Sequence, residues 1–178
     1  ALRDAARAGV HVLAYDCEVS SDRIAIADKV PVVLEDPALY EMVSPIVTWF
    51  QKNKRDLPWR NHPDAYRVWV SEIMLQQTRV EAVKPYYERF LRELPTVKDL
   101  AEAKEDQLLK LWEGLGYYNR VRNMQKAAQQ IMIDYQGQFP DTFEEIRSLK
   151  GIGNYTAGAI SAFAFGLPKP AVDGNVLR

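Results

Sequence analysis

The sequence predicts an all-α fold for residues 36–178, preceded by a short α/β extension over residues 1–35. From residue 36 onward, apolar residues recur every three or four positions, which is the period of a helix with one buried face. After residue 40 there is no run of alternating apolar and polar residues of the kind that marks a half-buried strand. Glycines and prolines separate the helical stretches, as expected of short connecting turns.

The first helices are predicted from their apolar spacing. Ser44 followed by Pro45 suits a cap and a first-turn proline, so one helix is expected to begin there. Residues 66–77 and 80–94 continue the helical period, and Pro85 either kinks the second of these helices or lies in its early turns. Residues 1–35 read differently, because their helix end, β-prone stretch and extended ending are too short to bury a core.

The later helices end at glycines. Residues 108–112 lead into a Gly-Leu-Gly turn at 114–116, and a long amphipathic helix over 121–135 ends at Gly137. Thr142 and Glu145 have the spacing of a capping box, which predicts a short helix after residue 142. Residues 157–165 are rich in small side chains and form the last of about seven predicted helices.

The composition is that of a folded chain. Of its 178 residues, 47% are hydrophobic and 26% charged, and no apolar run is long enough for a membrane helix. No signal peptide is visible, and the single cysteine, Cys17, excludes a disulfide framework or a thiolate metal site built from this chain alone. We therefore expect a reducing, cytoplasmic setting and no membrane partner.

The formal charge of −1 argues against a highly basic nucleic-acid coat protein. The acidic excess lies in the first 40 residues, which hold 4 basic and 7 acidic side chains, against 19 and 17 from residue 41 onward. A local basic face on the helical part is compatible with these counts.

A glycine hairpin between two predicted helices is a candidate phosphate-binding site. Gly151 and Gly153 would let backbone N–H groups approach a phosphate closely, and Lys150 lies within the hairpin. Tyr155 and Thr156 follow directly. A plain tight turn between helices is the alternative.

Two carboxyl groups are candidates for chemistry. Glu72 lies beside the apolar stripe of its predicted helix, and a carboxyl in apolar surroundings can be kept protonated as a proton donor. Its alternative role is a boundary residue paired with an arginine. Asp173 and Asn175 flank Gly174 after a proline-rich loop, and a helix cap with a turn is the alternative there.

Tandem tyrosines after the glycine turn are a candidate surface for stacking on bases. Tyr117 and Tyr118 are followed by Arg120 and Arg122, a combination that suits nucleic-acid contact. Tyrosines that fill a core are the alternative.

Taken together, these segments resemble the helix-hairpin-helix DNA glycosylases, and among them the MutY-type adenine DNA glycosylases. The resemblance covers residues 41–178. The matching motifs are LPWR (57–60), VWVSEIMLQQT (68–78), WEGLGYYNRVRN (112–123), LKGIGNYTAGAI (149–160) and PAVDGNV (170–176).

The resemblance implies an enzyme of base excision repair that hydrolyses the N-glycosidic bond of adenine mispaired with 8-oxoguanine or guanine. The adenine would be flipped out of double-stranded DNA into a pocket. Glu72 would be the general acid that protonates N7, and Asp173 would stabilise the oxocarbenium-like sugar. Tyr155 and Asn175 would position Asp173 and the water or sugar.

The resemblance also implies which residues hold the substrate. The adenine pocket would be formed by Arg55, Trp59, Arg60 and Leu75. The DNA contacts would come from Gln77, Thr78, Leu115, Tyr117, Lys150, Gly151, Gly153 and Thr156. Of these, Gln77 and Tyr117 would insert into the base stack around the mispair.

The sequence departs from its relatives at three points. Endonuclease III-like lyases carry a lysine nucleophile directly after the hairpin, where this chain has Tyr155, so a monofunctional hydrolase is expected. Lys150 stands where many relatives have proline, which leaves the backbone contacts available. The family's full enzyme continues with a four-cysteine loop for a 4Fe-4S cluster and a C-terminal recognition domain; those cysteines would lie beyond residue 178, and no metal site is expected in this chain.

Residues 1–35 resemble the C-terminal end of an SfsA-type protein, which indicates a gene fusion or read-through junction, with an unrelated extension as the alternative. For residues 36–178, the alternative functions are another mismatch-specific glycosylase of the same superfamily and a non-catalytic DNA-binding fragment. A fragment of the helical domain would leave helices half covered. A monomer is expected.

Overall fold

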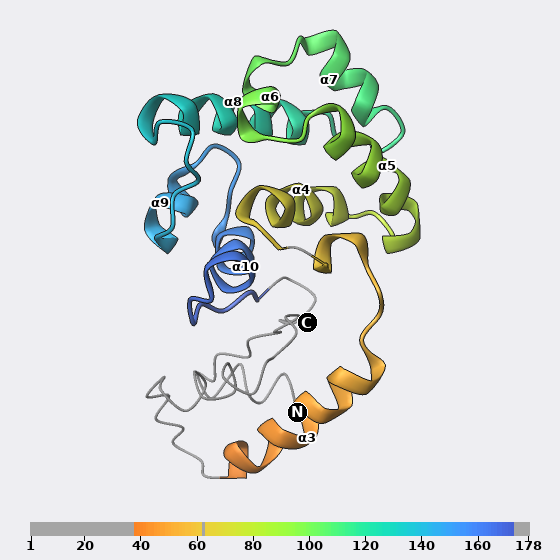
Figure 1. Cartoon of the computed structure of the whole chain (residues 1–178), viewed down its shortest axis with the longest axis vertical. Helices are drawn as coiled ribbons and strands as arrows, with labels where there is room; N and C mark the ends of the chain where they lie inside the picture. The colour runs from red at the N-terminus through yellow and green to blue at the C-terminus, as the bar shows by residue number, and fades with distance from the viewer. Residues whose placement is uncertain (1–37, 62, 173–178) are drawn as a thin grey trace.

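A computed structural model describes residues 38–61 and 63–172 of the chain (Figure 1). The predicted extension over 1–35, Asp173 and Asn175 lie outside the described residues. No strand occurs within the described ranges, which confirms the all-α prediction. The elements are α3 (Ala38–Asn53), the 3₁₀ turn η1 (Pro58–Arg60), α4 (Ala65–Leu75), α5 (Val80–Glu93), α6 (Val97–Glu102), α7 (Glu105–Trp112), α8 (Asn119–Asp134), α9 (Phe143–Ser148) and α10 (Asn154–Phe165).

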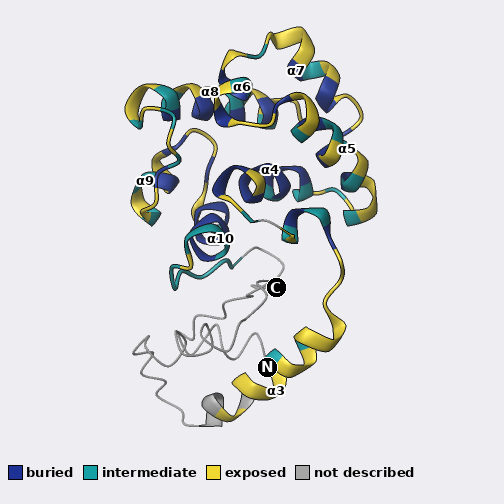
Figure 2. Cartoon of the chain, viewed as in Figure 1, coloured by how far each residue is buried: buried dark blue, intermediate teal, exposed yellow. Residues whose placement is uncertain are grey.

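Helix α4 is the centre of the fold. It packs against α5 and α10, and α10 in turn packs against α9 (Figure 1). Eight of its eleven residues are buried, so it is mostly dark blue in Figure 2. Trp69, Val70 and Met74 have no exposed surface. Burial of each such side chain contributes about 1.5–3 kcal/mol relative to leaving it in water.

Large aromatic side chains join the elements of the core. The Trp69 ring meets Phe139, which precedes α9, edge-on with centroids 5.6 Å apart. Phe90 of α5 and Trp112 of α7 pack in the same way at 6.0 Å. Helices α6 and α8 also pack closely against each other. Edge-to-face pairs of this kind add roughly 0.5–1.5 kcal/mol beyond the area they bury.

The predicted helix start at Ser44 and Pro45 is wrong. Helix α3 begins at Ala38, and Pro45 lies inside it. A proline suits a first turn, but it also fits a helix interior at the loss of one hydrogen bond, here the bond to the Glu41 carbonyl. Pro85 likewise lies inside α5, in its second turn. The local sequence does not distinguish these two situations.

Two short helices depend on threonine caps. The Thr142 side chain accepts a hydrogen bond from the Glu145 N–H at 3.3 Å, which confirms the predicted cap of α9. Helix α6 was not predicted from its apolar spacing because it has six residues. Its capping box is formed by Thr96 and Asp99: Thr96 Oγ1 accepts from the Asp99 N–H at 3.2 Å, and Asp99 Oδ2 accepts from the Thr96 N–H at 3.0 Å.

Helix α3 stands apart from the packed helices (Figure 1). Val43, Ile46 and Trp49 are exposed on it, Trp49 at 64%. A contact between Phe50 and the Arg60 guanidinium, 5.9 Å from the ring centroid, links α3 to η1. Among the described helices, none has the length and apolar character that crossing a membrane would require.

Candidate active site

A cavity of about 240 Å³ lies where η1, α4 and α10 meet. It brings together six residues that the sequence predicts for the site, five of them from three separate motifs and Arg55 from just before the first of these motifs. These are Arg55, Trp59, Arg60, Glu72, Leu75 and Tyr155. The remaining wall is formed mainly by apolar residues from the same elements, with Ser71 and Lys169 as polar members.

Helix α4 supplies the acidic wall of the cavity. Val68, Glu72 and Leu75 are spaced by four and three residues, so they share one face of the helix, and all three line the cavity. Glu72 is half-buried and is the only acidic residue of α4. The rest of α4 is locked in the core, which fixes the position from which the Glu72 carboxyl reaches into the cavity.

The turn η1 supplies the opposite wall. The Trp59 ring is nearly buried and packs edge-on against Tyr87 of α5, with centroids 5.4 Å apart. Arg60 Nη1 donates to the Arg55 carbonyl at 2.9 Å, and burial lowers the pKa of the Arg60 guanidinium. Arg60 is therefore tied to the backbone of Arg55, and both arginines line the cavity together with the Trp59 ring, a combination that suits a flat, polar-edged ring.

Helix α10 and the segment after it close the third side. Tyr155 is half-buried in the first turn of α10. At the other end the helix stops at Gly166, whose φ of +66° turns the chain back, and the Leu167 N–H donates to the Ser161 carbonyl at 2.9 Å. A Cβ on Gly158 would lie 2.0 Å from the Pro170 carbonyl oxygen, so only glycine lets the returning segment lie this close.

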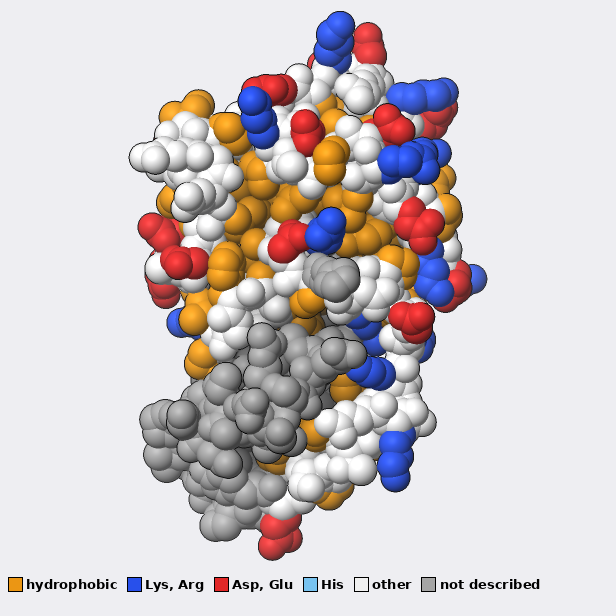
Figure 3. Space-filling model, viewed as in Figure 1, with side chains coloured by type: hydrophobic (Ala, Val, Ile, Leu, Met, Phe, Trp, Pro, Cys, Tyr) orange, Lys and Arg blue, Asp and Glu red, His pale blue; other side chains and the backbone are white. Residues whose placement is uncertain are grey.

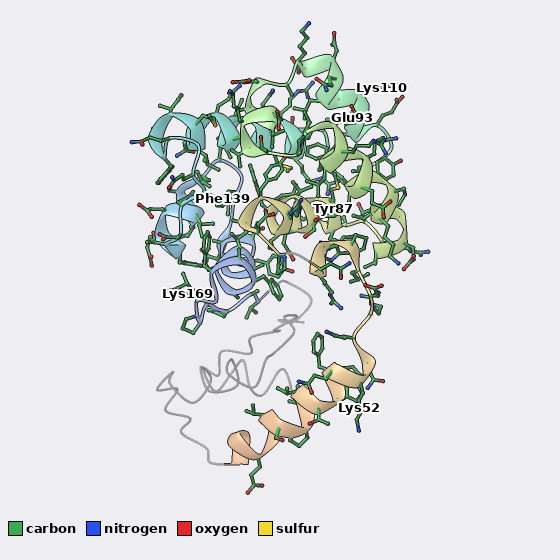
Figure 4. All side chains as sticks on the ribbon, viewed as in Figure 1. Lys52, Tyr87, Glu93, Lys110, Phe139 and Lys169 are labelled. Carbon is green, nitrogen blue, oxygen red and sulfur yellow. The ribbon has the colours of Figure 1, made fainter. Side chains whose placement is uncertain are left out.

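Lys169 was not singled out from the sequence, yet it lines the cavity. Its ammonium lies 5.1 Å from the centre of the Phe143 ring and 4.0 Å from Glu144 Oε1, both on α9. Figure 4 labels Lys169 beyond the end of α10. The sequence around Lys169, with a proline on either side, does not predict a site. Lys169 reaches the cavity only because the chain turns back over α10.

The hairpin between α9 and α10 has the expected geometry. Gly151 has a φ of +80°, and a Cβ there would lie 2.9 Å from Asn123 of α8, so glycine is required on both counts. Lys150 and Gly153 are exposed. Gly153 caps α10 without a side-chain hydrogen bond, and the positive end of the helix dipole at this point favours an anion. Thr156, by contrast, is only 3% exposed.

Two loops beside the cavity carry residues predicted to enter a base stack. Gln77, which follows α4, and Tyr117, which follows α7, have positive φ values of 58° and 49°. Such φ values are uncommon in residues other than glycine and indicate a backbone conformation that the surrounding structure holds in place. Tyr117 is 68% exposed, whereas the neighbouring Leu115 is buried and packs in the core. Thr78 is half-buried, and its N–H donates to the Leu75 carbonyl at 3.3 Å.

Basic and acidic side chains are interspersed on the face seen in Figure 3, with no extended basic stripe there. No three metal-binding side chains (His, Cys, Asp or Glu) gather anywhere in the described part of the chain. The only cysteine, Cys17, precedes that part. These residues therefore do not fit the four-thiolate set of a 4Fe-4S cluster.

Comparison with known proteins gives the same assignment for most of the chain. Residues 70–178 match the HhH-GPD superfamily of base excision DNA repair proteins. The chain is 48% identical over 134 residues to the adenine DNA glycosylase of Buchnera aphidicola subsp. Acyrthosiphon pisum (strain APS), covering 75% of this chain and 38% of that protein. It is 44% identical over 142 residues to the Homo sapiens adenine DNA glycosylase, covering 75% of this chain and 26% of that protein. The chain thus spans between about a quarter and two fifths of the length of the curated relatives it matches.

Solved structures show the same fold. A thermostable thymine-DNA glycosylase matches with a TM-score of 0.72 and 31% identity, over 76% of this chain and 63% of that one. A non-covalent endonuclease III–DNA complex matches with a TM-score of 0.66 and 24% identity, over 78% of this chain and 64% of that one. At that identity the second likeness concerns the fold alone.

Proposed function

Because the chain belongs to the HhH-GPD superfamily of base excision DNA repair proteins, we propose that it removes adenine mispaired with 8-oxoguanine or guanine by hydrolysing its N-glycosidic bond. The observation that carries this proposal is the cavity that joins Glu72, Trp59 and Tyr155 from three separate elements. Curated relatives at 39–48% identity that are named adenine DNA glycosylases support the choice of base.

Glu72 acts as the general acid. Adenine is a poor leaving group as an anion, so a proton must reach the ring, at N7, as the bond between N9 and C1′ breaks. Glu72 reaches the cavity from a rigid helix, between Val68 and Leu75, which exclude water from the proton's path. After the transfer, the Glu72 carboxylate is placed to take a proton from the water that adds to C1′, which restores the acid.

Asp173 supplies the negative charge that stabilises the oxocarbenium-like sugar. It follows Ala171, which lines the cavity, by two residues, and covalent geometry limits the distance between their Cα atoms to about 7 Å. Tyr155 borders the same cavity and, together with Asn175, orients the Asp173 carboxylate and the water or sugar. The division of labour needs one carboxyl protonated and the other ionised.

The remaining predicted residues bind the DNA. The indole of Trp59 and the side chains of Arg55, Arg60 and Leu75 enclose the flipped adenine. Lys150, Gly151 and Gly153 hold a phosphate at the start of α10, where the positive end of the helix dipole favours an anion. Gln77 and Tyr117 enter the base stack from which the adenine is flipped, with Thr78 beside them. The buried Leu115 supports the loop from the core side, and the buried Thr156 supports the hairpin in the same way. The enzyme acts on double-stranded DNA as a monomer. A 4Fe-4S cluster would be held by cysteines outside these 178 residues.

A thymine mismatch glycosylase is the second candidate, because the thermostable thymine-DNA glycosylase has the same fold at 31% identity. The two candidates differ in the released base. The test is a single-turnover measurement on duplexes that hold adenine opposite 8-oxoguanine, adenine opposite guanine, or thymine opposite guanine, with the free base identified by chromatography. The assay uses the protein as it is encoded, with any sequence that flanks these residues.

Release of adenine that is lost in both Glu72→Gln and Asp173→Asn supports the proposed function. Release of thymine instead favours the second candidate. Tight binding of the duplex with no base released, by a folded protein, reduces the chain to a DNA-binding module.

A further inference from the structure

Arg120, in the first turn of α8, is bonded to both loops beside the cavity. Its Nη1 donates to the carbonyls of Ile73 at 2.9 Å and Gln76 at 2.6 Å, at the end of α4. Its Nη2 donates to the carbonyls of Leu115 at 3.0 Å and Gly116 at 3.2 Å, in the loop after α7. One guanidinium thus joins segments that are more than 40 residues apart in the sequence.

Aromatic rings hold the same guanidinium in place. Its central carbon lies 5.5 Å from the ring centroid of Trp112 and 5.5 Å from that of Tyr117. The Trp112 indole N–H also donates to the Gly116 carbonyl at 3.0 Å, so that carbonyl accepts from two donors. Burial lowers the pKa of Arg120, but an arginine remains charged in a protein.

Two of the four carbonyls bonded to Arg120 belong to residues that directly precede side chains proposed to enter the base stack. Gln76 immediately precedes Gln77, and Gly116 immediately precedes Tyr117. Gln77 and Tyr117 are two of the three residues other than glycine with positive φ in the described part of the chain. Arg120 therefore grips the backbone one residue before each of the two side chains that are proposed to enter the base stack.

We propose that Arg120 is a positioning residue that couples Gln77 and Tyr117, so that the two side chains enter the duplex as one unit with a fixed spacing. This inference rests on the proposed function. Arg120 does not line the cavity, so its effect on base removal would pass through the loops and not through the reacting atoms.

The chemistry requires arginine at this position. Two nitrogens on a rigid plane reach four carbonyls on two segments, whereas a lysine ammonium is a single point that bonds to one segment or the other. The planar group also packs against both rings, which a tetrahedral ammonium does less well. Arg120→Lys therefore keeps the charge and removes the coupling.

The first test uses the protein as encoded and two readouts. One is the single-turnover release of adenine opposite 8-oxoguanine, and the other is the fluorescence of 2-aminopurine placed at the adenine position, read at early times so that it reports unstacking before base release. Arg89→Lys is the matched control, because Arg89 also donates to a carbonyl, that of Leu111 at 3.0 Å, and lies over a ring, that of Tyr86 at 5.0 Å, but bonds to one element only.

We expect Arg120→Lys to lower both the unstacking signal and the release rate by about tenfold or more, and Arg89→Lys to change them by less than about threefold. In a Tyr117→Ala background the loss caused by Arg120→Lys should shrink to less than about threefold, because the unit is already broken. An equal loss in both backgrounds would mean a general structural role and would overturn the proposal.

A second test leaves Arg120 unchanged, in case its replacement prevents folding. Gln77 and Tyr117 are exposed, so Gln77→Ala and Tyr117→Ala should fold normally. If the two act as a unit, the double variant should lose hardly more unstacking than either single variant; losses that simply multiply would contradict the coupling. If the wild-type protein unstacks the base without releasing it, the proposed function is contradicted but the coupling by Arg120 is not. If it neither unstacks nor releases the base, the proposed function and the coupling are both contradicted.

Discussion

The cavity and the loops beside it are built in different ways. The cavity walls belong to helices whose other faces are locked in the core, and α4 alone has eight buried residues of eleven. The two loops have exposed tips with residues at positive φ, and one half-buried guanidinium bonds to the backbone of both. Packing spreads the support of the cavity over many side chains, whereas the proposed link between the two loops runs through Arg120.

This difference predicts which substitutions affect stability and which affect only DNA handling. A change in the cavity walls should alter both folding and base removal, because the same contacts serve both. A change at a loop tip should leave folding almost untouched and lower the unstacking of the base. The expected effect on the free energy of unfolding therefore falls from the cavity walls to the loop tips.

The largest effect is expected for Gly158→Ala. The new methyl group would lie 2.0 Å from the Pro170 carbonyl oxygen, so the segment that lines the cavity must move away from α10. Overpacking of this kind costs about 1–3 kcal/mol of stability. Denaturant unfolding and adenine release should both be affected. Gly166→Ala is the control, since its Cβ meets nothing within 4 Å among the described residues and carries only the strain of a φ of +66°.

A smaller effect is expected for two buried tyrosines of the core. The Tyr66 hydroxyl donates to the Leu94 carbonyl at 2.8 Å, whereas the Tyr87 hydroxyl is buried without a partner among the described residues. Tyr66→Phe should cost about 0.5–1.5 kcal/mol, and Tyr87→Phe should be neutral or stabilising. Chemical denaturation of both variants checks this, and equal losses would contradict it.

The same tyrosines predict how stability depends on pH. Burial raises the pKa of both phenols above the ordinary value of 10.0. The unfolded chain therefore ionises first, so the folded state loses stability as pH rises above about 10, and this contribution is intact below that value. The Tyr66→Phe and Tyr87→Phe double variant should lose stability less steeply between pH 10 and 11 than the wild type. An unchanged slope would contradict the prediction.

Only a modest change in folding is expected for Gly116→Ala. Its Cβ would meet nothing within 4 Å among the described residues, and the φ of +68° should cost about 1 kcal/mol. The backbone before Tyr117 would nevertheless shift, so unstacking of 2-aminopurine should fall severalfold while the melting temperature drops only slightly. A large loss of stability with normal unstacking would reverse the distinction between loops and cavity.

No change at all is expected for Lys169→Gln in a lyase assay. Among the described residues Lys169 is the one lysine that lines the cavity, but its Nζ lies 4.0 Å from Glu144 Oε1 and 5.1 Å from the centre of the Phe143 ring, so it is engaged with α9 and not placed as a nucleophile. Borohydride should therefore trap no covalent DNA adduct with either the wild type or the variant. An adduct that forms with the wild type and disappears in Lys169→Gln would show that the enzyme is not monofunctional.

Apolar spacing and glycines predicted most of the helical fold. The stripes that became α4, α5, α8 and α10 were recognisable because each helix is long enough to repeat its pattern. Turn glycines such as Gly114 and Gly151 do have positive φ. The helix start predicted at Pro45 was wrong because a proline in a helix interior and one in a first turn have the same local sequence pattern. Helix α6 was not predicted because it is too short to repeat its apolar spacing.

The candidate site was predicted less completely, since its parts depend on tertiary contacts. Six residues that the motifs and the family resemblance predict for the site do meet in one cavity. Lys169 and the bonds of Arg120 to Ile73 and Gln76 could not be predicted, because they join segments brought together only by packing. The burial of Leu115 and Thr156 likewise depends on how α7 and α10 pack, and not on their neighbours in the sequence.

The central claim is that the cavity performs the chemistry while the loops deliver the base to it. The most direct test measures unstacking and release in Glu72→Gln, with Glu81→Gln, an exposed glutamate at the start of α5, as the control. We predict that Glu72→Gln unstacks 2-aminopurine like the wild type and releases adenine about 10²–10⁴-fold more slowly, while Glu81→Gln does both normally. Release at the wild-type rate by Glu72→Gln, or loss of unstacking together with release, would contradict this account.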